Sequence, residues 1–169
     1  MIYYIFLDID GVLNDEVHIE KCYEMNGGYP MHMNHVPFDP KALTNLMNLV
    51  KKIREVGEPR IVLSSTWRLH EIDMEIVDAR IAEYGLSLFD KTPYIHSQRG
   101  LEIKDYLSNH QEENYKFIIL DDDKFDIETL YADKLVYVNR IYGLSITDVN
   151  KALKILDINM GDDQNGDCD

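Results

Sequence analysis

The sequence predicts an α/β domain built on one parallel β-sheet with helices on both of its faces. Apolar, strand-like runs alternate along the chain with segments of helical periodicity. Several of these runs have no polar break, as expected for strands that are buried on both faces. Three of them end abruptly in acidic or hydroxyl side chains. The carboxyl ends of the strands are where open α/β sheets place their sites.

The first strand is expected over residues 2–7, and Asp8, Asp10 and Gly11 follow it. Side chains two residues apart on a strand point the same way, so the two carboxylates should converge, and Gly11 allows a sharp turn. A divalent cation that prefers oxygen ligands, such as Mg²⁺, resolves their repulsion. The alternative is an acidic loop that binds a metal or forms a turn without further chemistry.

Residues 14–37 show no sustained period and contain glycine and proline breakers. A loop of this length in a compact domain is usually functional. We expect a small flap that carries aromatic and methionine side chains over the site; a disordered loop is the alternative. Cys22, His32 and His35 match no strong zinc spacing, so solvated loop histidines are favoured over a zinc site.

A helix is expected from residue 40 to Gly57, with Asp39 as its N-cap and Pro40 at its first position. Its apolar residues recur at helical spacing, which assigns them to the core.

The second strand is expected over residues 60–63, and Ser64 and Ser65 follow it. Their hydroxyls and free backbone N–H groups suit the oxygens of a phosphoryl group, although a plain helix N-cap has the same appearance. Trp67, the single tryptophan, is read as a core residue in preference to a platform for a substrate ring. Arg68 is a candidate contact for phosphate or substrate.

A helix over 71–84 and a short strand over 86–89 come next, and a further helix begins near Gly100. Arg99 stands at the start of that helix, and Lys104 lies one and a half turns later.

The third buried strand, residues 116–120, ends in Asp121, Asp122 and Asp123. The remaining elements are a polar turn at 111–115, a short helix at 125–131, a strand at 134–138 and a last helix capped by Ser145 or Thr147. Residues 1–158 are expected to form a single domain, and the acidic tail at 159–169 is expected to be disordered.

These segments, in order, resemble the four motifs of the haloacid dehalogenase (HAD) superfamily. The motifs are Asp-x-Asp-Gly after a hydrophobic strand, a strand closed by Ser or Thr, a cation at a helix start, and a strand closed by Asp-Asp. The run from Ser64 to Arg68 is most similar to small-cap HAD phosphatase domains of bacterial and phage RNA-end repair proteins. The resemblance implies a HAD-like Rossmannoid sheet with a minimal cap.

The resemblance also implies residue roles. Asp8 would be the nucleophile that becomes an aspartyl phosphate, and Asp10 the general acid and base. The phosphate-binding residues would be Ser64, Ser65, Gly11 and, as the cation of the third motif, Arg99 in preference to Lys104. The Mg²⁺ ligands would be Asp8, the backbone carbonyl of Asp10, and Asp121. Asp122 would bind the ion through water or orient Arg99.

The composition limits the partners. The 169 residues contain 17 Lys and Arg against 31 Asp and Glu, a formal net charge of −14. This charge disfavours nucleic acid and anionic membranes as partners. No apolar run is long enough to span a bilayer, and Cys22 and Cys168 provide no disulfide framework. A cytoplasmic location is expected, because the chain starts without a basic leader.

The function predicted from the sequence is Mg²⁺-dependent hydrolysis of a phosphomonoester, with a small phosphorylated metabolite or a nucleotide as the favoured substrate. A phosphatase for 3′ or 5′ polynucleotide ends is the alternative. A non-catalytic module that binds Mg²⁺ and phosphate is a second alternative. A phosphorelay receiver is disfavoured, because its phosphoacceptor lies on a middle strand of the sequence and not in an N-terminal Asp-x-Asp.

Overall fold

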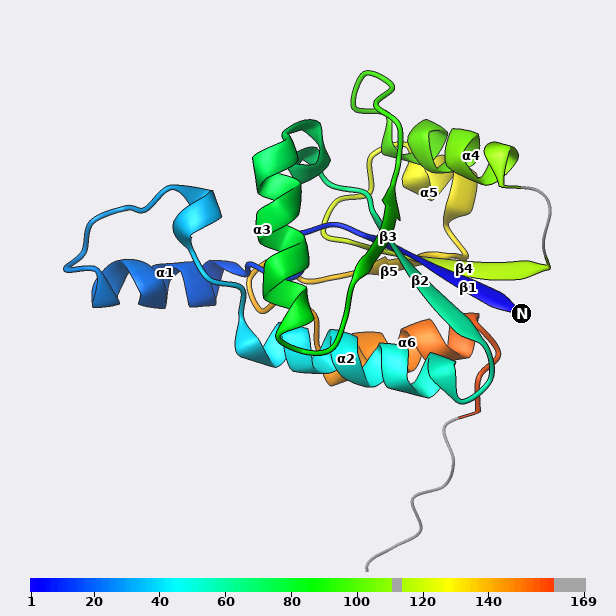
Figure 1. Cartoon of the computed structure of the whole chain (residues 1–169), viewed down its shortest axis with the longest axis horizontal. Helices are drawn as coiled ribbons and strands as arrows, with labels where there is room; N and C mark the ends of the chain where they lie inside the picture. The colour runs from blue at the N-terminus through cyan, green and yellow to red at the C-terminus, as the bar shows by residue number, and fades with distance from the viewer. Residues whose placement is uncertain (111–113, 160–169) are drawn as a thin grey trace, which may run out of the picture.

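The computed structural model describes residues 1–110 and 114–159, which contain a five-stranded parallel sheet in the order β3-β2-β1-β4-β5 (Figure 1). The strands are β1 (Ile2–Leu7), β2 (Glu58–Leu63), β3 (Leu88–Lys91), β4 (Tyr115–Asp121) and β5 (Leu135–Tyr137). The first strand of the sequence is therefore the central strand of the sheet. The predicted turn at 111–115 lies partly outside the described residues, and the predicted tail lies almost wholly outside them.

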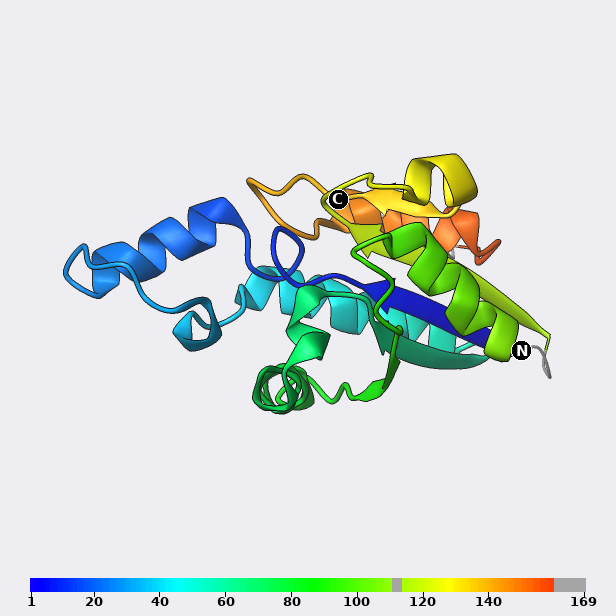
Figure 2. The ribbon, with the colours of Figure 1, turned by 90° about the horizontal axis from the view of Figure 1, so that it is seen from above.

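Helices cover both faces of the sheet (Figures 1 and 2). One face carries α2 (Pro40–Arg54), α3 (Glu71–Ala82) and α6 (Ile146–Ile155), and the other carries α4 (Arg99–Asn109) and α5 (Ile127–Tyr131). Strand β1 divides its side chains between the two cores: Tyr3, Ile5 and Leu7 belong to one, and Ile2, Tyr4 and Phe6 to the other. This alternation explains the unbroken apolar run of β1 and confirms the predicted α/β architecture.

Several element boundaries differ from the prediction. Strand β3 begins at Leu88 and not at residue 86, and α5 begins at Ile127. The cap of α6 is Ser145 and not Thr147, and Ser145 forms a capping box with Asp148. No helix within 1–110 and 114–159 combines the length and the apolar character needed to cross a bilayer.

The segment 14–37 is more regular than predicted. It contains α1 (Glu16–Met25) and a 3₁₀ turn, η1 (Met33–His35). Helix α1 has no buried residue, so it has no apolar stripe by which the sequence could reveal it. It extends away from the sheet, whereas the chain returns through η1 to the body of the protein (Figures 1 and 2).

Candidate active site

Three neighbouring strands bring their predicted site residues to one edge of the sheet. Leu7 pairs with Leu63 of β2 and with Leu120 of β4, so the residues that follow lie side by side. Asp8 N–H donates to Leu120 O at 3.0 Å, and Ser64 N–H donates to Leu7 O at 2.8 Å. The backbone N–H of Ser64 is therefore part of the sheet and is not free for phosphate, contrary to the expectation from the sequence.

Arg99, the first residue of α4, is the cation at this edge. Its Nη1 lies 2.8 Å from Asp121 Oδ2 and 3.4 Å from Asp8 Oδ1, and it also donates to the carbonyl oxygen of Ser64. Burial by itself lowers the pKa of Arg99, but Asp8, Asp121 and Glu102 outweigh this effect and raise it. Arg99 therefore stays charged. Lys104 is exposed on α4, away from the buried carboxylates.

Asp8, Asp121 and Asp122 form a group that fits a divalent cation. One carboxylate oxygen of each residue lies within 4.8 Å of the others. Burial and the neighbouring charge of Asp8 raise the pKa of Asp121 well above its ordinary value and that of Asp122 to about 6. Burial is the larger cause, and the repulsion from Asp8 adds to it, so a bound cation would favour the charged forms of these carboxylates. A set of carboxylate oxygens of this kind fits Mg²⁺.

Gly11 makes room for Asp122. Its φ is +76°, and a Cβ at this position would lie 2.2 Å from Asp122 Oδ2. Asp122, which is partly buried, also lies 3.8 Å from Nε of the exposed Arg140. It is Asp121 that forms the ion pair with Arg99. The two roles considered for Asp122, binding the ion through water or orienting Arg99, stay predictions.

Asp10 lies beside Asp8 and accepts a hydrogen bond from the indole of Trp67, with 2.9 Å between Nε1 and Oδ2. Burial raises the pKa of Asp10; the bond from Trp67 opposes the rise, the charge of Asp8 adds to it, and Asn14 opposes it. Trp67 is buried in the core as expected, and it also contacts the predicted acid and base.

Unpartnered polar atoms surround these carboxylates. Among the described residues, the hydroxyls of Ser64 and Ser65 and the side-chain amide of Asn14 are buried without a hydrogen-bond partner of standard geometry. Buried polar groups are normally paired, so such a cluster indicates a place for a ligand or water. Asn14 was missed by the sequence analysis, because an isolated Asn after a turn carries no signal.

Arg68 is not placed to contact a substrate. It is buried, and its guanidinium donates to the carbonyl oxygens of Ser65, Thr92 and Pro93 and to Glu102 Oε2. Glu102 is fully buried and lies 3.9 Å from Arg99 Nε. Arg68 and Glu102 therefore tie the loop that carries the serines to the helix that carries Arg99.

Asp126 holds the start of α4. Its carboxylate accepts hydrogen bonds from Gly100 N–H at 2.7 Å and from Leu101 N–H at 2.9 Å. An acidic side chain suits the unpaired N–H groups of a helix N-terminus. Although Asp126 precedes α5, it stabilises the first turn of α4 and with it the position of Arg99.

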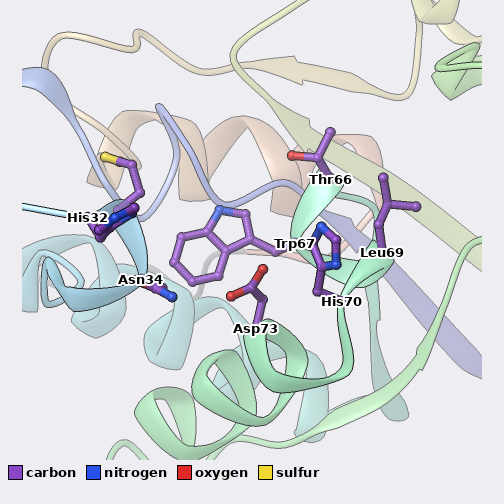
Figure 3. A pocket seen from close by; sticks show the side chains of 8 residues that line it. His32, Asn34, Thr66, Trp67, Leu69, His70 and Asp73 are labelled. Carbon is purple, nitrogen blue, oxygen red and sulfur yellow. The ribbon is translucent and has the colours of Figure 1, made fainter.

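A cavity of about 370 Å³ lies beside Trp67 (Figure 3). His32 and Asn34 of the returning segment border it on one side, and His70 and Asp73 on the other. The returning segment therefore lines a cavity together with Trp67, the residue whose indole contacts Asp10. The carboxylates of the site are not among the residues that line this cavity.

The parallel sheet and the acidic edge are those of a HAD-superfamily domain. A sequence model of one family, described as the HAD domain in Swiss Army Knife RNA repair proteins, matches residues 4–149. The chain belongs to this family. No curated protein and no solved structure matches the chain. The family indicates phosphatase-type hydrolysis in general.

Proposed function

We propose that the protein is a Mg²⁺-dependent phosphomonoester hydrolase that works through an aspartyl phosphate on Asp8. The observation that carries this proposal is the position of Arg99, whose Nη1 faces both Asp8, just after the central strand β1, and Asp121, at the end of β4. A nucleophilic carboxylate beside a fixed cation suits attack on an anionic phosphate.

Asp8 attacks phosphorus, and the bond from phosphorus to the ester oxygen breaks as Asp10 donates a proton to that oxygen. Asp10 then takes a proton from the water that attacks the phosphorus of the aspartyl phosphate, which releases phosphate and restores Asp8. Burial supports the first role of Asp10, because it raises the pKa and helps the carboxyl group to keep a proton.

Arg99 and the hydroxyls of Ser64 and Ser65 would bind the phosphoryl oxygens, since the hydroxyls have no partner of standard geometry among the described residues. Asp8, the carbonyl of Asp10, Asp121 and Asp122 would hold Mg²⁺. When bound, the ion supplies positive charge that lets the anionic nucleophile approach an anionic phosphate.

A small phosphomonoester or a nucleotide is the favoured substrate, since a chain of net charge −14 repels polyanions. The description of the family favours a second candidate, the phosphorylated end of an RNA. A non-catalytic module that binds Mg²⁺ and phosphate is a third candidate. A cytoplasmic location stays a prediction from the sequence.

Phosphate release from a panel of esters, with Mg²⁺ and with EDTA, tests the proposal. The panel contains p-nitrophenyl phosphate, nucleotides, sugar phosphates and oligonucleotides phosphorylated at the 3′ or 5′ end. We expect release that needs Mg²⁺ and is lost in Asp8→Asn and Asp10→Asn. A wild-type protein that binds Mg²⁺ but hydrolyses no ester would support the non-catalytic module.

A further inference from the structure

The hydrogen bond between Trp67 and Asp10 distinguishes the two carboxyl oxygens of Asp10. It links the only tryptophan of the chain to the proposed acid and base at 2.9 Å. A buried indole N–H normally finds some acceptor, so a purely structural role is the alternative to be tested. The inference rests on the proposed function, because it concerns how Asp10 is held during hydrolysis.

The indole itself is held in place. Trp67 is 6% exposed, and the ring of Phe38 meets it edge-on with the ring centroids 5.8 Å apart. The guanidinium of Arg80 lies 4.7 Å from the centroid of Phe38 and 5.9 Å from that of Trp67, and it donates to the carbonyl oxygen of Asn34. Figure 3 shows the indole between the flap residues His32 and Asn34 and the start of α3. The indole N–H is thus a fixed donor.

An indole N–H can donate a hydrogen bond but cannot accept one. Asp10 Oδ2 is therefore the accepting oxygen, and a proton on this carboxyl group belongs on Oδ1. Oδ1 is buried, and no hydrogen bond of standard geometry to it is found among the described residues, although the nearby side chain of Asn14 acts to lower the pKa of Asp10. Oδ2 of Asp10 thus accepts the hydrogen bond from the indole, and Oδ1 is the oxygen that can carry the proton.

We propose that Trp67 is a positioning residue that fixes the carboxyl plane of Asp10 and reserves Oδ1 for proton transfer. In the first step the proton leaves Oδ1 for the ester oxygen as the bond from phosphorus to that oxygen breaks and the bond from Asp8 to phosphorus forms. In the second step Oδ1 receives a proton from water as the water oxygen bonds to phosphorus and the bond to Asp8 breaks.

The test compares two leaving groups in the Trp67→Phe variant. An alkyl phosphate needs a proton on its leaving oxygen, whereas p-nitrophenolate leaves without one. In Trp67→Phe we expect kcat/KM to fall about tenfold or more for the alkyl ester and only about twofold for p-nitrophenyl phosphate. The larger fall is a part of the roughly 10²–10⁴-fold rate increase that general acid catalysis usually contributes. An equal fall for both esters, or no fall, would overturn the proposal.

Phe38→Leu is the matched control. This substitution loosens the packing of the indole but removes no hydrogen bond to Asp10. It should therefore lower kcat/KM for both esters by the same factor. A wild-type protein that hydrolyses neither ester would instead contradict the proposed function. Failure of the proposed function is thus distinguished from failure of the role proposed for Trp67.

If Trp67→Phe does not fold, the single indole N–H signal in the NMR spectrum remains a test. We expect it to shift, and to exchange faster with solvent, in Asp10→Ala. An unchanged signal would overturn the proposal.

Discussion

Arg68 and Glu102 form a fully buried ion pair, with 2.5 Å between Nη2 and Oε2 and side-chain exposures of 3% and 0%. Neither residue reaches the carboxylates of the site directly. They join the loop after β2 to helix α4, and Arg99 lies between this pair and Asp8. The position of Arg99 thus depends on these two residues behind it.

Glu102→Gln should lower both stability and activity. It leaves the charge of Arg68 buried without its partner, which typically costs about 3–5 kcal/mol of the free energy of unfolding. It should also lower kcat for every ester alike, because Arg99 loses one of its supports. Denaturant unfolding and phosphate release measure the two effects. Glu128→Gln, which breaks the exposed pair with Lys124, should cost less than about 1 kcal/mol and leave kcat unchanged. Equal stability losses in the two variants would contradict the prediction.

Gly11→Ala should weaken Mg²⁺ binding. The new methyl group would occupy the place of Asp122 Oδ2, and the backbone would keep a φ of +76° that alanine disfavours. Gly85→Ala is the control, because its φ is +70° and nothing lies within 4 Å of the added Cβ. Isothermal titration with Mg²⁺ should show at least about tenfold weaker binding in Gly11→Ala and normal binding in Gly85→Ala. Normal Mg²⁺ affinity in both variants would exclude a role for this close approach.

Asp126→Ala should lower both the stability of the protein and its kcat. The loss of the two hydrogen bonds to α4 should cost about 1–2 kcal/mol of stability and lower kcat, because the first turn of α4 carries Arg99. Ser145→Ala removes the cap of α6 and should cost a similar amount of stability with no change in kcat. A normal kcat in Asp126→Ala would show that the cap does not determine the position of Arg99.

The stability of the metal-free protein should fall as the pH rises from about 4 to above 6. The pKa of Asp122 is raised to about 6 in the folded protein, against about 3.9 in the unfolded chain. The folded state therefore holds more protons in this window, and unfolding becomes easier as they are lost. Thermal unfolding without Mg²⁺ should show a smaller fall in Asp122→Asn than in the wild type. Identical pH profiles would contradict the raised pKa of Asp122.

The sequence was sufficient to predict that the site residues directly after the strands lie close together. Asp8, Ser64 and Asp121 each follow an apolar run, and parallel pairing of β1, β2 and β4 necessarily brings such residues together. Arg99 could be located because it begins a helix whose apolar spacing starts one turn later. The catalytic roles of these residues stay predictions.

The supporting contacts could not be predicted, because each joins segments that are distant in the sequence. The bond from Trp67 to Asp10 and the bonds from α4 to Asp126 depend on the folded arrangement of the chain. Nothing in the sequence distinguishes Glu102 from an exposed charged residue of an amphipathic helix, yet it is fully buried. Helix α1 was missed for the opposite reason: it buries nothing, so it lacks the periodic pattern that marks a helix.

The central claim is that Asp8 carries the phosphoryl group, and mass spectrometry of Asp10→Asn after incubation with p-nitrophenyl phosphate and Mg²⁺ tests it most directly. This ester can transfer its phosphoryl group without an acid, whereas water cannot be activated in the variant, so the intermediate should accumulate. The account predicts the added mass of one phosphoryl group on the peptide that contains Asp8, and none in EDTA or in the Asp8→Asn, Asp10→Asn double variant. Phosphate release by the wild type with an adduct on another residue would contradict it.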